Sequence, residues 1–301
     1  MMTIFNRLVL FFVPYLPLFF VRMIAGRYVA GESREGALDL VADLNKKGFS
    51  TTIDILGEHV ESQTVAETIT QQYRNLYKSI KHRGLDCNVS VKPSHVGLDL
   101  GPDNLRKNIL RLMEKAQELD NFLRIDMESS KATDDTIQIY ETCLEQYDKV
   151  GTVFQAYLYR TENDIRRLLG PKFNCRLCKG IYREDPAIAI QDRQAINDNF
   201  LKLLRLIFEN EGYVGIATHD LGLIKSILAL IEELQVPNSR FEFQVLYGVP
   251  MSGWLKKLQD RGHKVRVYVP FGPEWYAYSI RRLKENPNIV GYVIGNILRK
   301  K

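Results

Sequence analysis

The feature that most constrains the fold of this chain is a repeated alternation between short apolar, β-branched runs and longer amphipathic stretches. Each amphipathic stretch has the apolar spacing of a helix, and each short run has the composition of a buried strand. Strand followed by helix, repeated eight times, predicts a (β/α)8 barrel, because right-handed crossovers between parallel strands bring the last strand back to the first. A doubly wound open sheet is the alternative. The predicted strands are 50–56, 87–94, 121–128, 151–157, 175–182, 213–220, 241–248 and 264–272, and the clearest helices are 65–81, 105–119, 134–147, 193–211, 221–234 and 275–286.

The composition fits a folded protein of one or two domains. Hydrophobic residues make up 45% of the 301 residues and charged residues 26%, which is enough apolar material for a core and rules out a disordered chain. The 41 Lys and Arg against 36 Asp and Glu leave a net charge of +5, and the two signs alternate along most of the sequence. Because nucleic-acid-binding proteins concentrate basic residues on one surface, nucleic acid is not an expected partner.

The cysteines indicate a reducing compartment, because four are too few for a disulfide scaffold in a chain of this length. Cys175 and Cys178 form a C-x-x-C pair, but no second pair accompanies it. If both lie on one strand, their odd spacing points the two thiols to opposite faces. We therefore expect no metal site at this pair.

An apolar segment precedes the repeated units. Residues 8–20 carry no charge and are bracketed by Arg7 and Arg22. The run is shorter than the roughly 20 residues that cross a bilayer, and its two prolines would interrupt a helix. A cleaved signal peptide, an interfacial anchor and an arm packed on the protein body are the three interpretations, and the absence of a clear cleavage site disfavours the first. We expect residues 1–27 to form an apolar N-terminal helical arm, with membrane-surface contact left open, and residues 28–301 to form the barrel.

Charged and polar side chains stand at the ends of the predicted strands, where an ordinary buried strand would end in turn residues. Active sites of (β/α)8 barrels form at this end of the strands. One such residue alone would more often be a solvated strand terminus, but so many at consecutive strand ends predict one shared polar cavity. The residues are Lys92, Asp126, Glu128, Gln155, Arg176, Lys179, Thr218, His219, Leu246, Tyr247 and Tyr268.

The last amphipathic stretch places Tyr278, Arg281, Arg282 and Glu285 on one helical face, since their spacing is i, i+3, i+4 and i+7. Two guanidinium groups on one face can hold a carboxylate through bidentate hydrogen bonds, which lysine does poorly. The alternative is a solvated lattice of arginine and glutamate on an outer helix. The same four letters, IRRL, recur at residues 165–168, which shows how easily such a lattice arises.

The same residues carry a resemblance to the proline dehydrogenase family. Three longer motifs match in family order: CRLCKGIY at 175–182, RVYVPFG at 266–272 and YSIRRLKEN at 278–286. Shorter matches are LGE at 56–58, VSVK at 89–92, IDME at 125–128, QAY at 155–157 and ATH at 217–219. The chain is too short for the fusion with an aldehyde dehydrogenase, so it resembles the single-activity bacterial form.

The resemblance implies a distorted TIM-type barrel that binds FAD non-covalently. The implied reaction is the oxidation of L-proline to Δ1-pyrroline-5-carboxylate by hydride transfer to the flavin N5 atom. This is the first step of proline catabolism to glutamate, with a membrane quinone as the electron acceptor and pyrroline-5-carboxylate dehydrogenase acting downstream. Because this chain offers no obvious general base, we expect the amine of the substrate to govern the pH dependence.

The resemblance also implies a role for each matching position. Lys92, Arg281 and Arg282 would bind the carboxylate of proline, and Leu246, Tyr268 and Tyr278 would enclose its ring. Arg176 would lie beside the flavin N5 atom, and Gln155, Lys179, Thr218 and His219 would be further FAD contacts. Asp126 would orient Lys92 or Tyr268, while Glu58 and Glu285 would pair with the arginines. Arg176, Tyr268 and Asp126 are therefore the expected catalytic group.

Two other functions remain open at this stage, because the barrel fold hosts many chemistries. One is a different enzyme acting on a small carboxylate, and the other is a non-catalytic protein that binds proline through Arg281 and Arg282. We expect a cytoplasmic protein, with peripheral contact at the inner face of the cell membrane if residues 8–20 serve a quinone-linked enzyme.

Overall fold

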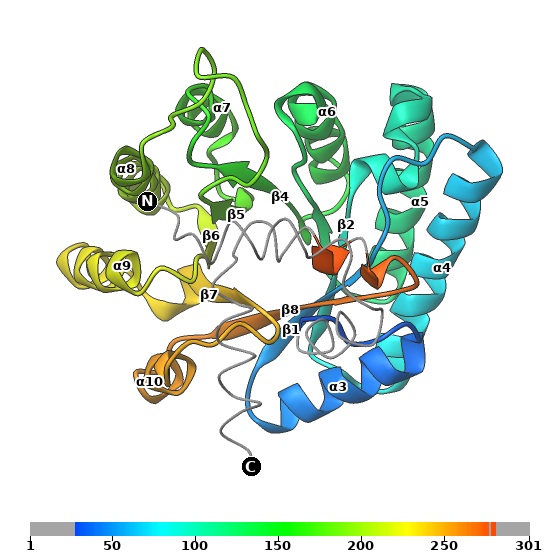
Figure 1. The fold of residues 1–301 in the computed structure, drawn as a ribbon, viewed down its shortest axis with the longest axis horizontal. Coiled ribbons are helices and arrows are strands. Elements are labelled where there is room, and N and C mark those ends of the chain that lie inside the picture. Colours follow the sequence, from blue (N-terminus) through cyan, green and yellow to red (C-terminus); the bar gives the residue numbers. More distant parts are fainter. Residues whose placement is uncertain (1–27, 277, 281–301) are drawn as a thin grey trace.

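The described part of this computed structural model comprises residues 28–276 and 278–280, so the predicted arm at residues 1–27 lies outside it. Within this part, eight parallel strands form a closed barrel, in which every strand pairs with the next and β8 returns to β1. Figure 1 shows the helices as a ring around the strands. The predicted (β/α)8 barrel is confirmed, and the doubly wound alternative is wrong.

The strands begin close to the predicted positions but end earlier. The loop after β2 begins at Lys92 and continues into Pro93, which cannot donate a ladder hydrogen bond. The chain leaves β5 through Gly180, whose φ of +113° no strand residue adopts. The strands are β1 (Ser50–Ile55), β2 (Cys87–Val91), β3 (Leu123–Ile125), β4 (Val150–Gln155), β5 (Asn174–Cys178), β6 (Tyr213–Ala217), β7 (Phe241–Leu246) and β8 (Val265–Phe271).

A helix follows each of the first seven strands, and α3 (Arg34–Lys46) precedes β1. Aspartates cap the start of two helices. The side chain of Asp192 accepts a hydrogen bond from the backbone N–H of Ala195 at the start of α8, and that of Asp220 accepts from the backbone N–H groups of Gly222 and Leu223 at the start of α9. Helices α3, α7 and α10 were not among the clearest predicted helices. The seven strand-following helices are α4 (Gln63–His82), α5 (Pro102–Glu118), α6 (Thr133–Leu144), α7 (Thr161–Leu168), α8 (Arg193–Glu209), α9 (Leu221–Glu233) and α10 (Trp254–Asp260).

The barrel interior is polar, whereas the apolar core lies between the strands and the helices. Long polar side chains need room to cross the barrel, and glycines on the strands provide it. A Cβ atom at Gly151 would lie 2.3 Å from Nη1 of Arg124, and one at Gly215 would lie 2.3 Å from Nε2 of Gln244. Glycine on one strand therefore makes room for a large polar side chain on the adjacent strand, and hydrogen bonds between such side chains fill the barrel interior.

Among residues 28–276 and 278–280, no helix is both long and apolar enough to cross a membrane.

Candidate active site

A cavity of about 340 Å³ opens where the strands end. Thr218 does not line it; its buried hydroxyl accepts a hydrogen bond from the backbone N–H of Asp220 at 3.2 Å. Arg281, Arg282 and Glu285 lie outside the described residues. The predicted residues that the structure brings together in the wall are Glu58, Lys92, Asp126, Glu128, Gln155, Arg176, Lys179, His219, Leu246, Tyr268 and Tyr278.

Arg176 projects from β5 across the interior of the barrel. Its Nη1 donates to Oδ1 of Asp126 at 2.7 Å, its Nε to Oε1 of Gln244 at 2.6 Å, and its Nη2 to Oγ of Ser90 at 3.4 Å. The guanidinium carbon also lies 5.1 Å from the centre of the Tyr268 ring, which is a cation–π distance. Partners from four different parts of the barrel therefore hold one cation at the floor of the cavity.

Tyr268 on β8 connects two buried carboxylates. Its hydroxyl lies 2.8 Å from Oδ2 of Asp54 and 3.2 Å from Oδ2 of Asp126, and it donates to these acceptors. Burial, together with the negative charges of Asp126 and Asp54, raises the pKa of the Tyr268 phenol well above its usual value. The phenol therefore stays protonated and acts as a hydrogen-bond donor at neutral pH.

Lys92, directly after β2, forms a buried ion pair with Asp54 on β1, with 2.8 Å between Nζ and Oδ2. The other carboxylate oxygen of Asp54 accepts a hydrogen bond from the hydroxyl of Tyr73 on α4 at 2.9 Å. Burial alone would lower the pKa of Lys92, but the Asp54 carboxylate raises it above the usual value. The ammonium group therefore keeps its charge at the edge of the cavity.

The family motifs do not include Asp54. The resemblance implies that Asp126 orients Lys92 or Tyr268; the structure shows Asp126 in contact with Tyr268, while Asp54 is the partner of Lys92. A signal was present in the sequence, since Asp54 is the one charged residue in the strand run STTIDI. A carboxylate in a buried strand needs a charged or hydrogen-bonding partner, so such a residue marks a polar interior.

Polar groups from β4, β5 and β6 line another part of the same cavity. Nε2 of Gln155 donates to the backbone oxygen of Glu128 at 3.2 Å. Its Oε1 is buried and has no hydrogen-bond partner among the described residues. Because a buried polar atom without a partner is costly, this oxygen fits a site that receives an N–H or O–H donor from a ligand.

Lys179 and His219, which follow β5 and β6, are held by contacts with residues at the ends of neighbouring strands. Nζ of Lys179 lies 2.6 Å from Oδ2 of Asp220, the residue that caps α9. Nε2 of His219 accepts a hydrogen bond from the backbone N–H of Leu246 at 2.9 Å. This ring nitrogen therefore carries no proton, and the imidazole presents its other nitrogen as the donor.

The loop after β5 depends on the absence of a side chain at Gly180. A Cβ atom there would lie 2.2 Å from Cδ1 of the Tyr157 ring, so the loop packs on this ring only with glycine. Cys178, at the end of β5, lines the cavity, whereas Cys175 is fully buried in the hydrophobic core. The two thiols lie on opposite faces, as their spacing predicts. In the described part of the chain, no cluster of His, Cys, Asp and Glu could hold a metal ion.

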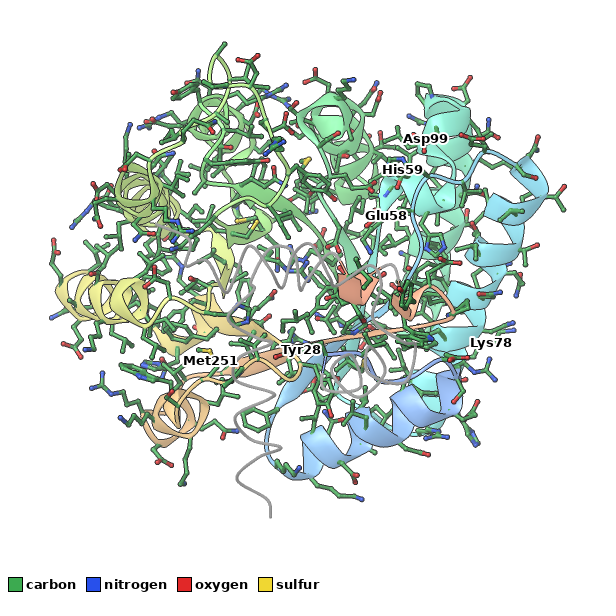
Figure 2. All side chains as sticks on the ribbon, in the orientation of Figure 1. Tyr28, Glu58, His59, Lys78, Asp99 and Met251 are labelled. Carbon is green, nitrogen blue, oxygen red and sulfur yellow. The ribbon has the colours of Figure 1, made fainter. Side chains whose placement is uncertain are left out.

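Ser94 ties together the loops that follow β1, β2 and β3. Its backbone N–H and its hydroxyl donate to the two carboxylate oxygens of Glu128 at 2.7 and 2.6 Å, and its Oγ accepts from the backbone N–H of His59 at 3.2 Å. Figure 2 shows His59 beside Asp99, and its Nδ1 lies 3.0 Å from Oδ2 of that residue. These contacts fix the loop that carries Glu58 at the rim of the cavity.

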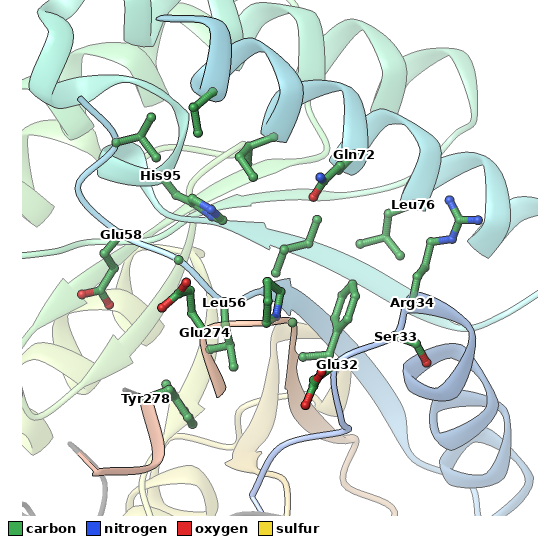
Figure 3. Close-up of a pocket in the computed structure, with 18 of the residues that line it drawn as sticks. Glu32, Ser33, Arg34, Leu56, Glu58, Gln72, Leu76, His95, Glu274 and Tyr278 are labelled. Atoms are coloured by element: carbon green, nitrogen blue, oxygen red, sulfur yellow. The ribbon is translucent and has the colours of Figure 1, made fainter. Parts of the chain in front are cut away.

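A second cavity, of about 830 Å³, adjoins the first on the side of α4. Figure 3 shows Glu58, His95 and Glu274 in its wall, with Gln72 and Leu76 of α4 across from them. Glu58 and Tyr278 line both cavities, so the two spaces share a wall. Burial and the nearby Lys92 lower the pKa of His95 to about 3, so this histidine is neutral.

Comparison with known families gives a match over most of the chain. The sequence model described as proline dehydrogenase matches residues 37–293. Proline dehydrogenase 1 of Bacillus subtilis strain 168 is 37% identical over 279 residues, which cover 93% of this chain and 92% of that protein. The proline dehydrogenase of Deinococcus radiodurans is 33% identical over 285 residues, which cover 92% and 90%.

Solved structures with the same fold come from proline utilization A, or PutA. The structure from Bdellovibrio bacteriovorus inactivated by N-propargylglycine has a TM-score of 0.81 at 24% identity and covers 87% of this chain. The structure from Corynebacterium freiburgense has a TM-score of 0.75 at 23% identity and covers 96% of it. This chain spans 32% and 34% of those longer chains, and the likeness shows the barrel fold alone.

Proposed function

Because this chain belongs to the proline dehydrogenase family, enzymes that oxidise proline in its catabolism, we propose that it converts L-proline to Δ1-pyrroline-5-carboxylate with non-covalently bound FAD. A membrane quinone is the proposed acceptor of the electrons, and pyrroline-5-carboxylate dehydrogenase is the proposed enzyme downstream. One observation carries this proposal. Lys92, Arg176 and Gln155 all line one cavity at the open end of the barrel, and the buried Oε1 of Gln155 has no hydrogen-bond partner among the described residues.

The residues around that cavity fit a flavin nucleotide. Oε1 of Gln155 needs a donor, and a flavin ring carries N–H groups as well as carbonyl oxygens. Arg176, Lys179 and His219 supply N–H donors of the kind that flavin oxygens and phosphates accept. Gln155, Arg176, Lys179, Thr218 and His219 would hold the cofactor. When bound, FAD takes up the two electrons and the hydrogen that leave the substrate.

Lys92 is the proposed contact of the substrate carboxylate. An ammonium has three donors, and the described contacts of Lys92 use one of them for Asp54. The remaining donors can hold the carboxylate in a fixed place, which brings the ring carbon into position for oxidation. Arg281 and Arg282 are proposed to complete this contact. Leu246, Tyr268 and Tyr278 line the cavity and offer apolar surface to the ring of proline.

The amine of proline must be neutral before the adjacent carbon can be oxidised. Two cations, Lys92 and Arg176, face the cavity and favour the neutral form of an amine placed near them. Asp54 and Asp126 already form hydrogen bonds with Lys92, Arg176 and Tyr268, so no side chain in the described wall is assigned to take up the amine proton. The substrate amine, rather than a side chain, should therefore set the pH dependence.

A quinone acceptor gives the apolar segment at residues 8–20 a proposed purpose, because the enzyme must reach the bilayer. We place the barrel of residues 28–301 in the cytoplasm, with this segment at the inner face of the cell membrane. Flotation with liposomes tests the proposal on the intact chain and on a chain that begins at Arg27. Equal flotation of the two proteins would reject it.

The reaction is tested by mixing FAD-loaded protein with L-proline in the absence of oxygen. Loss of the oxidised flavin absorbance is expected on mixing with L-proline, and D-proline serves as a control for stereochemistry. Lys92→Met should keep its FAD but require far more proline for the same bleaching. Fully loaded wild-type protein that stays oxidised at saturating L-proline would overturn the proposed function.

A further inference from the structure

We propose that Gln244, oriented by Glu242, is a positioning residue that holds the guanidinium of Arg176 at the floor of the cavity. The inference rests on the proposed function, because it assigns Arg176 a place beside the flavin. Gln244 and Glu242 lie on β7 and are almost completely buried. Neither belongs to the motifs that connect this sequence to its family.

The hydrogen bonds of Gln244 leave only one orientation for its amide. Nε2 donates to Oε1 of Glu242 at 2.7 Å, and Oε1 accepts from Nε of Arg176 at 2.6 Å. A carboxylate can only accept and a guanidinium can only donate, so the amide must turn its NH2 group to Glu242 and its oxygen to Arg176. Because the carboxylate of Glu242 is held in place, the amide of Gln244 is held in place too, and its oxygen holds the guanidinium of Arg176.

Glu242 is itself rigidly held and ionised. Nε of Arg266 donates to its Oε1 at 2.7 Å, and Nη1 of Arg266 donates to the backbone oxygen of Thr51 at 2.6 Å. Burial would raise the pKa of Glu242, but the charge of Arg266 outweighs this effect and lowers it to about 2. The carboxylate is therefore an ionised acceptor at neutral pH.

The neighbouring strand makes room for this arrangement. Gly215 on β6 pairs with Glu242 in the sheet, and a Cβ atom at Gly215 would lie 2.3 Å from Nε2 of Gln244. Any larger residue would push the amide away from its two partners. The glycine and the glutamine thus form one structural unit, and a continuous chain of hydrogen bonds runs from Thr51 through Arg266, Glu242 and Gln244 to Arg176.

This chain of hydrogen bonds determines where the positive charge of Arg176 lies. Without Gln244, Nε of Arg176 loses its acceptor, and Asp126, the longer contact to Ser90 and the ring of Tyr268 remain as its described restraints. A cation beside a flavin stabilises its reduced, negatively charged form. Displacing that cation should make the midpoint potential of the bound flavin more negative, and it should leave the carboxylate contact at Lys92 in place.

The test compares Gln244→Leu and the longer Gln244→Met with Thr152→Val, a control that removes a different buried hydrogen bond, the one between Thr152 and the backbone of Ile125. Each FAD-loaded protein is titrated with reductant and reference dyes, and proline kinetics are measured alongside. Both Gln244 variants should show a more negative midpoint potential and a kcat lowered by roughly tenfold to hundredfold, the range for a lost hydrogen bond to a charged group. KM for proline should stay within about twofold.

Gln244→Glu provides a signature that a purely structural role would not produce. A protonated carboxyl has the shape of the amide and can make the same two hydrogen bonds. Burial and the adjacent Glu242 raise the pKa of the introduced group, whereas the guanidinium of Arg176 lowers it. The midpoint potential of the flavin in Gln244→Glu should match that in the wild type at low pH. As the pH rises and the introduced carboxyl ionises, the potential should become more negative than in the wild type. This pH dependence should be absent from Gln244→Leu.

The outcomes separate the two proposals. If wild-type protein binds FAD and all Gln244 variants behave like Thr152→Val, the positioning role is wrong and the proposed function stands. If the wild type binds no FAD, the proposed function fails and the inference fails with it. The positioning role is supported if the midpoint potential of the flavin changes with pH in Gln244→Glu as described and KM for proline stays constant.

Discussion

Lys92 and Asp54 form an ion pair whose two side chains are only 13% and 1% exposed, with 2.8 Å between Nζ and Oδ2. A buried pair of this kind adds little stability compared with two apolar residues of similar size. Breaking it by removing one partner, however, leaves an uncompensated buried charge at a cost of about 3–5 kcal/mol. Asp54 therefore has a structural role as the partner of Lys92, whereas Lys92 has the proposed role of binding the substrate.

Replacing Asp54 by alanine should affect both stability and substrate binding. We expect Asp54→Ala to lower the free energy of unfolding by about 3 kcal/mol, because Lys92 loses its partner. KM for proline should rise by roughly tenfold or more, since the ammonium is no longer held in place. Urea unfolding and steady-state kinetics measure the two effects. The double variant Asp54→Ala/Lys92→Met should regain most of the stability and none of the affinity, and a double variant less stable than the single one would contradict this account.

A methyl group at Gly180 should disturb the loop that leaves β5. The φ of +113° is unfavourable for any residue with a side chain, and the added Cβ would overlap the ring of Tyr157. We expect Gly180→Ala to lower the free energy of unfolding by about 1–3 kcal/mol and to weaken FAD binding, because Lys179 precedes this glycine. Gly84→Ala is a suitable control, since that glycine also has positive φ but has open space around it. Equal FAD affinity in the two variants would show that the contact with Tyr157 is unimportant.

His95 should make the protein less stable in acid. Its pKa is about 3 in the folded protein against an ordinary value of 6.5, so the folded chain binds this proton less readily than the unfolded chain. Its contribution to stability is complete above about pH 6.5 and is lost as the pH falls towards 3, with a slope of up to about 1.4 kcal/mol per pH unit. His95→Gln cannot take up this proton. Urea unfolding at several pH values should show a shallower decline for the variant, and parallel curves would contradict the assignment.

The strand positions could be predicted because their pattern is local. The run from Phe241 to Leu246 alternates aromatic or aliphatic residues with Glu242 and Gln244, which is the period of a strand with one polar face. Glycine and proline then mark where strands end. Helix α10 escaped prediction because its seven residues are too few to establish a helical period.

The pairing of site residues could not be predicted from local pattern. Asp54 and Lys92 are 38 positions apart, and Arg176 meets Gln244 over 68 positions, so these contacts exist only once the barrel has closed. Strand ends nevertheless indicated most of the cavity wall, because parallel strands all end at the same rim of a barrel. Thr218 shows the limit of that inference: it stands at a strand end, but its side chain turns away to the start of α9.

Replacing Gln155 should affect cofactor binding with little effect on the stability of the protein. Its Oε1 contributes no hydrogen bond to the described part of the folded chain, and its Nε2 makes a single contact with the backbone of Glu128. Gln155→Leu should therefore change the free energy of unfolding of the FAD-free protein by no more than about 1 kcal/mol. If the oxygen receives a donor from FAD, the dissociation constant for FAD should rise by roughly tenfold to hundredfold.

Flavin fluorescence titration measures that dissociation constant, and urea unfolding of the FAD-free protein measures the stability. Gln146→Leu is the matched control, because the side chain of this exposed glutamine likewise donates to a backbone oxygen, that of Thr142. A large loss of stability in Gln155→Leu with unchanged FAD affinity would mean that the buried oxygen serves the fold, through a partner outside the described residues. Weaker FAD binding at unchanged stability would instead mean that the cofactor is the partner of Oε1 of Gln155 on β4. This would explain why a polar atom that is costly to bury without a partner lies there.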